Sequence, residues 1–420
     1  APLSLLPLSM IVRSLLTTTV SSSPVLLPPS LRLMSVLAHS SNSLLNPDHN
    51  PVLRWFLKKT FYAQFCAGEH PDEVRQTIRR LKDIGFTGVI LGYAKEVVLS
   101  ETQAHDLVSG GNDPKAAHGI ASEIAQWVDG TEATVKLAQP GDFVALKFTG
   151  AGRQALYSLS ERLPPPAALA EAIDRVCACA AEHGVRLLFD AEQAALQPGI
   201  DDWTLAYMRR YNTEPGRAVI YGTYQAYLKS VPATLARHLE AARDAGFTLG
   251  VKLVRGAYLG SDPRHLIHDT KADTDAAYDA ITESMLRRQW GDVFRHGGRD
   301  GRADAPFPEA SLVVASHNAE SVRRARAIHD AGEAKIDVAF GQLQGMADEI
   351  SCELVSARKA ASRPGKALQT YKYLVWGSTG ECMKYLLRRA YENRDAVQRT
   401  RAGRDAMWAE LVRRAKQAVG

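Results

Sequence analysis

Acidic side chains are missing from the first 47 residues, which contain no aspartate or glutamate. Serine and leucine dominate this stretch, and Arg13 and Arg32 are its only strong bases. Such an acid-free, sparsely basic composition is typical of an organelle transit peptide. A secretory signal is disfavoured, because Arg13 and a cluster of prolines beginning at Pro24 interrupt the apolar core that it would need. We therefore predict an organelle transit peptide over residues 1–47, with a plain disordered tail as the alternative.

Long apolar runs and paired cysteines are also lacking. No uninterrupted apolar run approaches the roughly 18 residues of a spanning helix, so any membrane contact would be peripheral. The five cysteines are scattered, which excludes a disulfide framework and a zinc site built on CxxC pairs, and we expect no metal. The net charge of +5 is mild, and the arginine-rich stretch 399–416 is interleaved with acids, so we expect no nucleic-acid partner.

What is present is an alternation of short apolar runs with amphipathic segments. The predicted strands are 86–91, 143–148, 185–189, 218–221, 248–254, 312–315, 335–340 and 371–375. The predicted helices between them include 171–183, 231–245, 274–289, 319–331 and 346–359, and Gly184, Gly246 and Gly332 are placed to end three helices. Eight strands separated by helices predict a (β/α)8 barrel. An open doubly wound sheet is the alternative, but neither GxGxxG nor GxxxxGK[ST] follows the first strand.

The predicted organisation has four parts. These are a transit or disordered segment (1–47), an N-terminal helical arm (48–85), the barrel (86–394) and a C-terminal helical tail (395–420). Three stretches interrupt the barrel pattern: an insertion at 99–127, a proline-rich connector at 163–166 and a Gly/Arg/Asp-rich loop at 296–308.

Polar residues stand where several predicted strands end. Active sites of barrels lie at the carboxyl ends of the strands, so we expect these side chains to converge. They are Lys147, Asp190, Tyr224, Gln225, Lys252, the segment 255–258, and Ser316, His317 and Asn318. Two lysines on barrel strands also leave a Schiff-base aldolase open as a second enzyme class.

The last barrel helix carries a second candidate cluster. Tyr385, Arg388, Arg389 and Glu392 are spaced i, i+3, i+4 and i+7, which places them on one helical face. Arginines can bind a carboxylate bidentately, and Glu392 can hold the guanidinium groups or pair with a substrate ammonium. A solvated face with ion pairs fits the spacing equally well.

Five segments together resemble the proline dehydrogenase family. They are LLFDAE (187–192), KLVRGAY (252–258), ASHN (315–318), QLQGM (342–346) and YLLRRAYE (385–392), and their order and spacing match from about residue 86 to 393. The resemblance implies a distorted (β/α)8 barrel with an N-terminal helical arm and a C-terminal substrate-binding helix. It also implies noncovalent FAD and oxidation of L-proline to Δ1-pyrroline-5-carboxylate. For a eukaryotic member it implies transfer of electrons to ubiquinone on the matrix side of the inner mitochondrial membrane.

The resemblance also implies roles for individual residues. Arg388 and Arg389 would bind the proline carboxylate with help from Lys147, and Glu392 would orient the arginines. Leu343, Tyr373 and Tyr385 would line the apolar ring, and Tyr258 would shield the site. Asp190 and Lys252 would be the catalytic residues, with Lys252 near the flavin N5. The FAD-binding residues would be Ala191, Gln225, Lys252, Arg255, Gly256, Ala257, Ser316 and His317. Tyr373 would favour proline over hydroxyproline, because the related hydroxyproline enzymes carry a smaller residue there.

Overall fold

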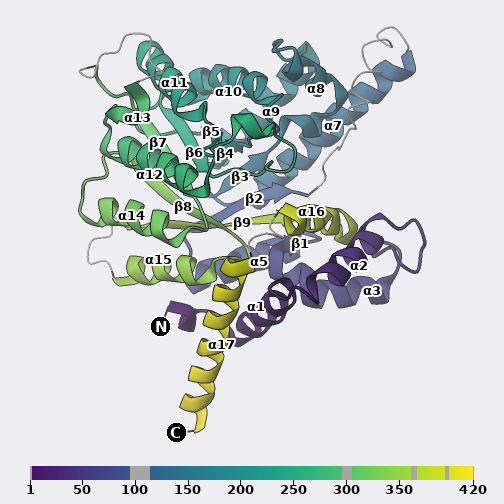
Figure 1. Ribbon diagram of the computed structural model, residues 1–420. Coiled ribbons are helices and arrows are strands. Elements are labelled where there is room, and N and C mark those ends of the chain that lie inside the picture. The colour runs from purple at the N-terminus through teal and green to yellow at the C-terminus, as the bar shows by residue number, and fades with distance from the viewer. Residues whose placement is uncertain (1, 95–113, 296–304, 361–366, 393–396, 420) are drawn as a thin grey trace. The chain divides into compact units, whose positions relative to one another are not determined.

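The computed structural model describes residues 2–94, 114–295, 305–360, 367–392 and 397–419 (Figure 1). The chain divides into two compact units, which are described separately. Unit 1 comprises residues 1–95 and 342–420, and unit 2 comprises residues 96–341.

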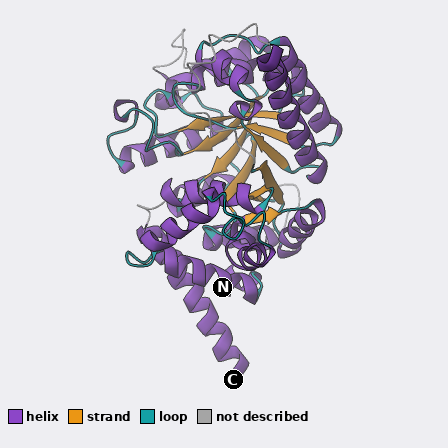
Figure 2. Ribbon diagram, turned by 90° about the vertical axis from the view of Figure 1, so that its right-hand side faces the viewer, coloured by secondary structure: helices purple, strands orange, loops and turns teal. Residues whose placement is uncertain are grey.

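Unit 2 contains a run of parallel strands in which each pairs with the next along the chain. The strands are β3 (Phe143–Leu146), β4 (Arg186–Phe189), β5 (Ile220–Gln225), β6 (Leu249–Val254), β7 (Ala310–Ala315) and β8 (Asp337–Leu343), the last of which ends just beyond the unit. The helices that connect them lie outside the strands (Figures 1 and 2). They are α7 (Pro114–Leu137), α8 (Arg153–Ser160), α9 (Ala167–Glu182), α10 (Gln197–Tyr211), α11 (Val231–Ala245), α12 (Lys271–Arg287), α13 (Gly291–Arg295) and α14 (Ala319–Asp330), with 3₁₀ turns η3 (Phe148–Ala151) and η4 (Arg264–Leu266).

The strands of unit 2 form where the sequence is apolar on both faces, as expected for a parallel sheet covered by helices. β3 is buried along its whole length, and β7 is buried except at its last residue. Gly184, Gly246 and Gly332 adopt φ values of 64°, 70° and 75°, a left-handed conformation that glycine tolerates without strain. The predicted helix ends are therefore confirmed.

Unit 1 contains the two chain ends. Its strands are β1 (Cys66–Gly68), β2 (Gly88–Tyr93) and β9 (Gln369–Trp376), and both β1 and β2 pair with β9 in parallel. Its helices are α1 (Leu8–Ser21), α2 (Leu27–His39), α3 (Pro51–Leu57), α4 (Ala63–Phe65), α5 (Pro71–Ile84), α15 (Asp348–Ala360), α16 (Thr379–Glu392) and α17 (Val397–Val419), with the 3₁₀ turn η1 (Pro2–Leu5) and the π-helical turn η2 (Lys58–Tyr62).

The sheet has the strand order β1-β9-β2-β3-β4-β5-β6-β7-β8, with an additional pairing of β9 with β8. This order is that of a (β/α)8 barrel whose eight strands are β2 to β9, so the predicted fold class is confirmed. All eight predicted strands are present within a few residues of their expected bounds. The short strand β1 was not predicted, because it lies in the stretch that we expected to be helical.

Residues 1–47, which we expected to be a transit or disordered segment, are largely helical in the structure. This segment forms η1, α1 and α2, and in unit 1 α1 packs against α17 while α2 packs against α16. Leu31, Leu37 and Ala38 of α2 are buried in a cluster with Met383 and Leu387 of α16. That the segment also directs the protein to an organelle stays a prediction. None of the helices in the described part of the chain combines the length and apolarity that crossing a bilayer requires.

Two of the predicted interruptions fall partly outside the described residues. Of the insertion predicted at 99–127, residues 99–113 lie outside them, and the rest forms the start of helix α7. Of the loop predicted at 296–308, only residues 305–308 are described, and they form no helix or strand. The connector at 163–166 is present as a non-helical link between α8 and α9.

Candidate functional site

In unit 2, the two predicted catalytic residues form an enclosed ion pair that connects β6 to the end of β4. Lys252 is only 6% exposed, and its Nζ atom lies 2.5 Å from Oδ1 of Asp190, the residue that follows β4. The backbone N–H of Asp190 donates to the carbonyl of Leu146 at 2.9 Å, which fixes the carboxylate at the strand ends. The structure therefore brings the two predicted catalytic residues together. A buried ammonium held in this way has a defined position, since moving it would separate two opposite charges that are both largely shielded from water.

A second set of contacts connects β3, β4 and the segment after β6. The hydroxyl of Tyr258 lies 3.5 Å from Nζ of Lys147 and 3.4 Å from the carbonyl oxygen of Ala191. Hydrogen bonds of this length are weak. Lys147 is half-buried and directly follows β3 rather than lying within it. The predicted substrate-side residues of unit 2 thus share one edge of the sheet.

Gln225 connects the segments that follow β4 and β6. Its side chain is buried, with Oε1 accepting from the backbone N–H of Ala257 at 2.9 Å and Nε2 donating to the carbonyl of Glu192 at 3.2 Å. A Cβ atom on Gly256 would lie 2.5 Å from ring atoms of Tyr227, so only glycine fits there. Tyr227, which was not predicted, donates to Asp262 at 2.5 Å and helps to fix this segment.

Arg255 is the centre of a cationic cluster after β6. Its guanidinium donates to Ser316 Oγ at 3.3 Å and to Ser321 Oγ at 2.7 Å, and it forms an ion pair with Asp275. Asp275 also pairs with Lys271 at 2.5 Å, so two cations share one carboxylate and the cluster keeps a net positive charge. Asp275, Lys271 and Ser321 were not predicted. Because they come from helices α12 and α14, only the tertiary structure brings them to Arg255.

The residues of this cluster fit the phosphate portion of FAD. A guanidinium flanked by two hydroxyl groups matches the geometry of phosphate oxygens. Gly256, next to Arg255, has no side chain, so a ligand can approach its backbone closely. His317, predicted to bind the same cofactor, directly follows Ser316 and is half-buried.

In unit 1, α16 presents the predicted aromatic and cationic face. The guanidinium carbons of Arg388 and Arg389 lie 5.9 and 5.6 Å from the ring centre of Tyr385, close enough for cation–π attraction. All three side chains are half-buried. Glu392 is the last residue of α16, and its side chain lies outside what the structure describes. The helix thus places two guanidinium groups and one ring on a common face, as predicted.

The predicted ring-lining residues of unit 1 lie on β8, β9 and α16. Tyr373 on β9 and Tyr385 on α16 both pack against one buried cluster that contains Cys382 and Leu386. The hydroxyl of Tyr373 would lie 3.1 Å from a Cβ atom on Gly92 of β2, so the absence of a side chain there makes room for the tyrosine. Leu343 is the last residue of β8.

Tyr224, which precedes Gln225, is not part of the site. Its hydroxyl lies 2.8 Å from Nδ1 of the buried His238, on the helix side of β5. Burial lowers the pKa of His238 to about 4, with a further contribution from Arg237. This pair is part of the packing between β5 and α11.

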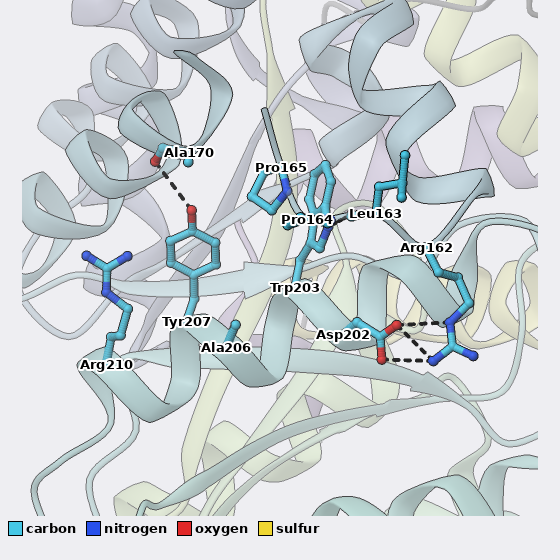
Figure 3. A pocket seen from close by; sticks show the side chains of 10 residues that line it. All are labelled: Arg162, Leu163, Pro164, Pro165, Ala170, Asp202, Trp203, Ala206, Tyr207 and Arg210. Atoms are coloured by element: carbon cyan, nitrogen blue, oxygen red, sulfur yellow. Dashed lines mark hydrogen bonds and ion pairs between the residues drawn. The ribbon is translucent and has the colours of Figure 1, made fainter. Parts of the chain in front are cut away.

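A hollow of about 450 Å³ lies elsewhere on unit 2 (Figure 3). It is lined by Arg162, Leu163, Pro164, Pro165, Ala170, Asp202, Trp203, Ala206, Tyr207 and Arg210. Trp203 Nε1 donates to the carbonyl of Leu163 at 2.8 Å, and Arg162 forms a bidentate pair with Asp202. None of the predicted site residues lines this hollow, and its contacts are those that hold the proline-rich connector against α10.

Comparisons with known proteins identify one family for this chain. A family model described as "Proline dehydrogenase" matches residues 74–402. The chain is 31% identical over 414 residues to a probable mitochondrial proline dehydrogenase of Schizosaccharomyces pombe, covering 87% of this chain and 80% of that protein. It is 30% identical over 397 residues to a hydroxyproline dehydrogenase of Homo sapiens, covering 86% of this chain and 82% of that protein.

A solved structure with a similar fold is proline utilization A from Bdellovibrio bacteriovorus, inactivated by N-propargylglycine. The TM-score is 0.63 at 18% identity, and the match covers 87% of this chain. The chain spans only 36% of that protein's length. At this level of identity the likeness shows the fold alone.

Proposed function

Because the chain belongs to the proline dehydrogenase family, we propose that it oxidises L-proline to Δ1-pyrroline-5-carboxylate with FAD as cofactor and ubiquinone as electron acceptor. The observation that carries this proposal is the extent of the family match, residues 74–402, which includes every residue predicted for the site. The same family match disfavours the Schiff-base aldolase, the second enzyme class that the sequence left open.

In unit 2, Arg255, Ser316, His317 and the segment around Gly256 would hold FAD, together with Ala191, Gln225 and Ala257. The bound cofactor would supply the hydride acceptor, which no amino-acid side chain can provide. Lys252, held by Asp190, would place a fixed positive charge beside the flavin and stabilise negative charge that develops there. Tyr258, in contact with Lys147, would help to exclude water.

In unit 1, Arg388 and Arg389 would bind the substrate carboxylate, and Glu392 would orient the two guanidinium groups. Leu343, Tyr373 and Tyr385 would pack against the apolar ring. The main contribution of this unit to catalysis would be to orient the substrate. Its charged groups would bind one end of the molecule, and its apolar side chains would contact the other.

Hydroxyproline is the second candidate substrate. The observation that favours it is the similarity to hydroxyproline dehydrogenases over about the same share of the chain as to the yeast proline dehydrogenase. The ratio of kcat/KM for L-proline to that for hydroxyproline separates the two. We expect the ratio to favour L-proline and to fall in Tyr373→Ala, which opens space next to Gly92.

We propose a mitochondrial location, on the matrix side of the inner membrane. Two relatives with this family's name are described as mitochondrial. Peripheral membrane contact is supported by apolar side chains on the N-terminal helices, since Leu16, Val52 and Trp55 are 65%, 75% and 62% exposed. Binding to vesicles that contain cardiolipin, lost when these three residues become serine, tests this contact. Equal sedimentation of both proteins would contradict it.

The proposed activity is tested with the purified full-length protein. We expect it to be yellow, to release FAD on denaturation and to reduce a soluble ubiquinone analogue when L-proline is added. A colourless protein that does not gain FAD on incubation with it would contradict the proposal.

A further inference from the structure

Lys372 is a charged residue that is almost completely enclosed. It lies on β9 next to Tyr373, and its side chain is only 1% exposed. The ammonium group has three protons and three acceptors in reach. These are the carbonyl oxygens of Leu343 at 3.4 Å and Met346 at 2.9 Å, and Oδ1 of Asp348 at 2.7 Å. One lysine therefore binds both ends of the turn that follows β8.

Asp348 is equally enclosed. Its side chain is 3% exposed, and it is the first residue of α15, where a negative charge also interacts favourably with the helix dipole. The pair thus joins β9 to the start of α15 across the turn formed by residues 344–347. All of these residues belong to unit 1.

The backbone of this turn adopts conformations that are stable only because the surrounding structure holds them. Gly345 has a φ of 73°, and Ala347 has a φ of 50°, a left-handed conformation that residues other than glycine rarely adopt. A Cβ atom on Gly345 would lie 2.5 Å from the carbonyl oxygen of Gln64, so the turn is also closely packed from the other side. The contacts of Lys372 oppose relaxation of this conformation.

The turn is connected to Tyr373 directly. The backbone N–H of Gln344 donates to the carbonyl of Tyr373 at 2.8 Å. Leu343, which precedes Gln344, and Tyr373 are two of the residues proposed to line the substrate ring. Since an apolar pair of similar volume often stabilises a fold as well as a buried ion pair does, stability alone is a weak reason for this arrangement.

We propose that Lys372 and Asp348 form a positioning pair, which fixes the carbonyl groups of Leu343 and Met346 and thereby the spacing between the Leu343 and Tyr373 side chains. That spacing would determine how well an apolar five-membered ring is bound. The inference rests on the proposed function, because it takes Leu343 and Tyr373 as the ring-lining residues. Neither Lys372 nor Asp348 would touch the substrate.

The test uses two inhibitors of the full-length, FAD-loaded protein. Cyclopentanecarboxylate has a ring and a carboxylate, whereas acetate has only the carboxylate. In the double variant Lys372→Met/Asp348→Leu, which leaves no unpaired buried charge, we expect cyclopentanecarboxylate to bind about tenfold more weakly, the effect of losing roughly one methylene contact. Acetate binding should not change. The KM for L-proline should rise by a similar factor, with a smaller change in kcat.

The control is Glu410→Gln, which weakens another buried ion pair of unit 1, between Glu410 and Arg414 of α17. It should leave the binding of both inhibitors unchanged, whatever its effect on thermal unfolding. If the double variant does not fold, Lys372→Gln repeats the comparison, because its amide can still donate to one carbonyl.

A folded variant with unchanged cyclopentanecarboxylate binding, or with equal weakening of both inhibitors, overturns the positioning role. Failure of the proposed function would look different. In that case the wild-type protein itself would neither oxidise L-proline nor bind cyclopentanecarboxylate, and the inference would fall with it.

Discussion

Asp48 Oδ1 accepts a hydrogen bond from the backbone N–H of Gly380 at 2.8 Å, in the first turn of α16. A second carboxylate, Glu69, accepts from the N–H of Thr379 at 3.2 Å. The two carboxylates satisfy N–H groups that a helix start leaves open, and their charge is favourable next to the positive end of the helix dipole. The N-terminal arm therefore fixes the helix that carries the predicted carboxylate clamp.

Deletion of residues 1–47 tests how far this support extends. A segment that served only as an address would be dispensable for catalysis. In the structure, however, the deletion would expose Met383 and Leu387 on α16. We now expect a lower melting temperature and a higher KM for L-proline, with FAD retained. The measurements are thermal unfolding and steady-state kinetics of protein 48–420 against full length. Equal stability and KM would show that α1 and α2 do not support α16.

The same truncation tests the address. We expect protein 48–420 to fail to enter mitochondria in cells, whereas the full-length chain enters. A truncated protein that still reaches the matrix would show that the address lies elsewhere in the chain.

Replacement of Arg389 by methionine removes one of the two predicted carboxylate ligands. Losing a charge-assisted hydrogen bond costs about 1.5–3 kcal/mol, so the KM for L-proline should rise roughly ten- to hundredfold. The FAD content should stay the same. Arg404→Met, which removes an arginine of α17 that pairs with Asp405, is the matched control and should leave KM unchanged. Wild-type kinetics in Arg389→Met would remove this residue from the site.

Replacement of Lys252 by methionine should slow reduction of the flavin by L-proline. The structure adds an expected loss of stability, because Asp190, whose side chain is 12% exposed, would lose the ammonium group that lies 2.5 Å from it. Lys252→Arg keeps the charge and is the control for this loss. Stopped-flow absorbance measures the reduction rate in protein that has retained FAD. Reduction at the normal rate in Lys252→Met would exclude Lys252 from catalysis.

The buried His238 should make part of the stability depend on pH. Its pKa is about 4 in the folded chain and near 6.5 when unfolded, so between these values the unfolded state binds more protons. Its contribution is fully present above pH 6.5 and is lost as the pH falls towards 4, by about 3 kcal/mol. Asp201 has the opposite effect on the pH dependence of stability. Burial raises its pKa to about 7, so its contribution is lost as the pH rises towards 7.

The difference between wild type and His238→Gln isolates this effect from that of Asp201. The free energy of unfolding, measured with urea, should fall more steeply with acid in the wild type than in the variant. Parallel pH profiles would contradict the assignment.

The sequence was sufficient to predict the barrel because its strands are apolar on both faces and its helices end at glycine. It was not sufficient for β1, whose three residues Cys66-Ala-Gly carry no periodic signal and form a strand only by pairing with β9. It also failed for α1, where the hydroxyls of Thr17, Thr18 and Ser21 donate to carbonyls one turn back. The packing of such a helix, rather than its composition, determines that it folds.

Part of the candidate site was predictable for a simple physical reason. Residues at or just beyond the carboxyl ends of parallel strands share one edge of the sheet, so Lys147, Asp190 and Lys252 could be grouped from their positions alone. Two partners of Arg255, Asp275 and Ser321, could not be predicted in this way, because they lie on helices α12 and α14 and not at the end of a strand. The ion pair of Lys372 could not be predicted either, since the neighbours of this residue on β9 are apolar or aromatic and its carboxylate partner lies on α15.

The most direct test of the account is the absorbance of the bound flavin in the absence of oxygen. Addition of L-proline to the purified full-length protein should bleach the flavin band, and addition of a ubiquinone analogue should restore it. D-proline, with the opposite configuration, should leave the band unchanged. A flavin band that L-proline does not bleach would contradict the proposed function, whatever the protein's fold and family.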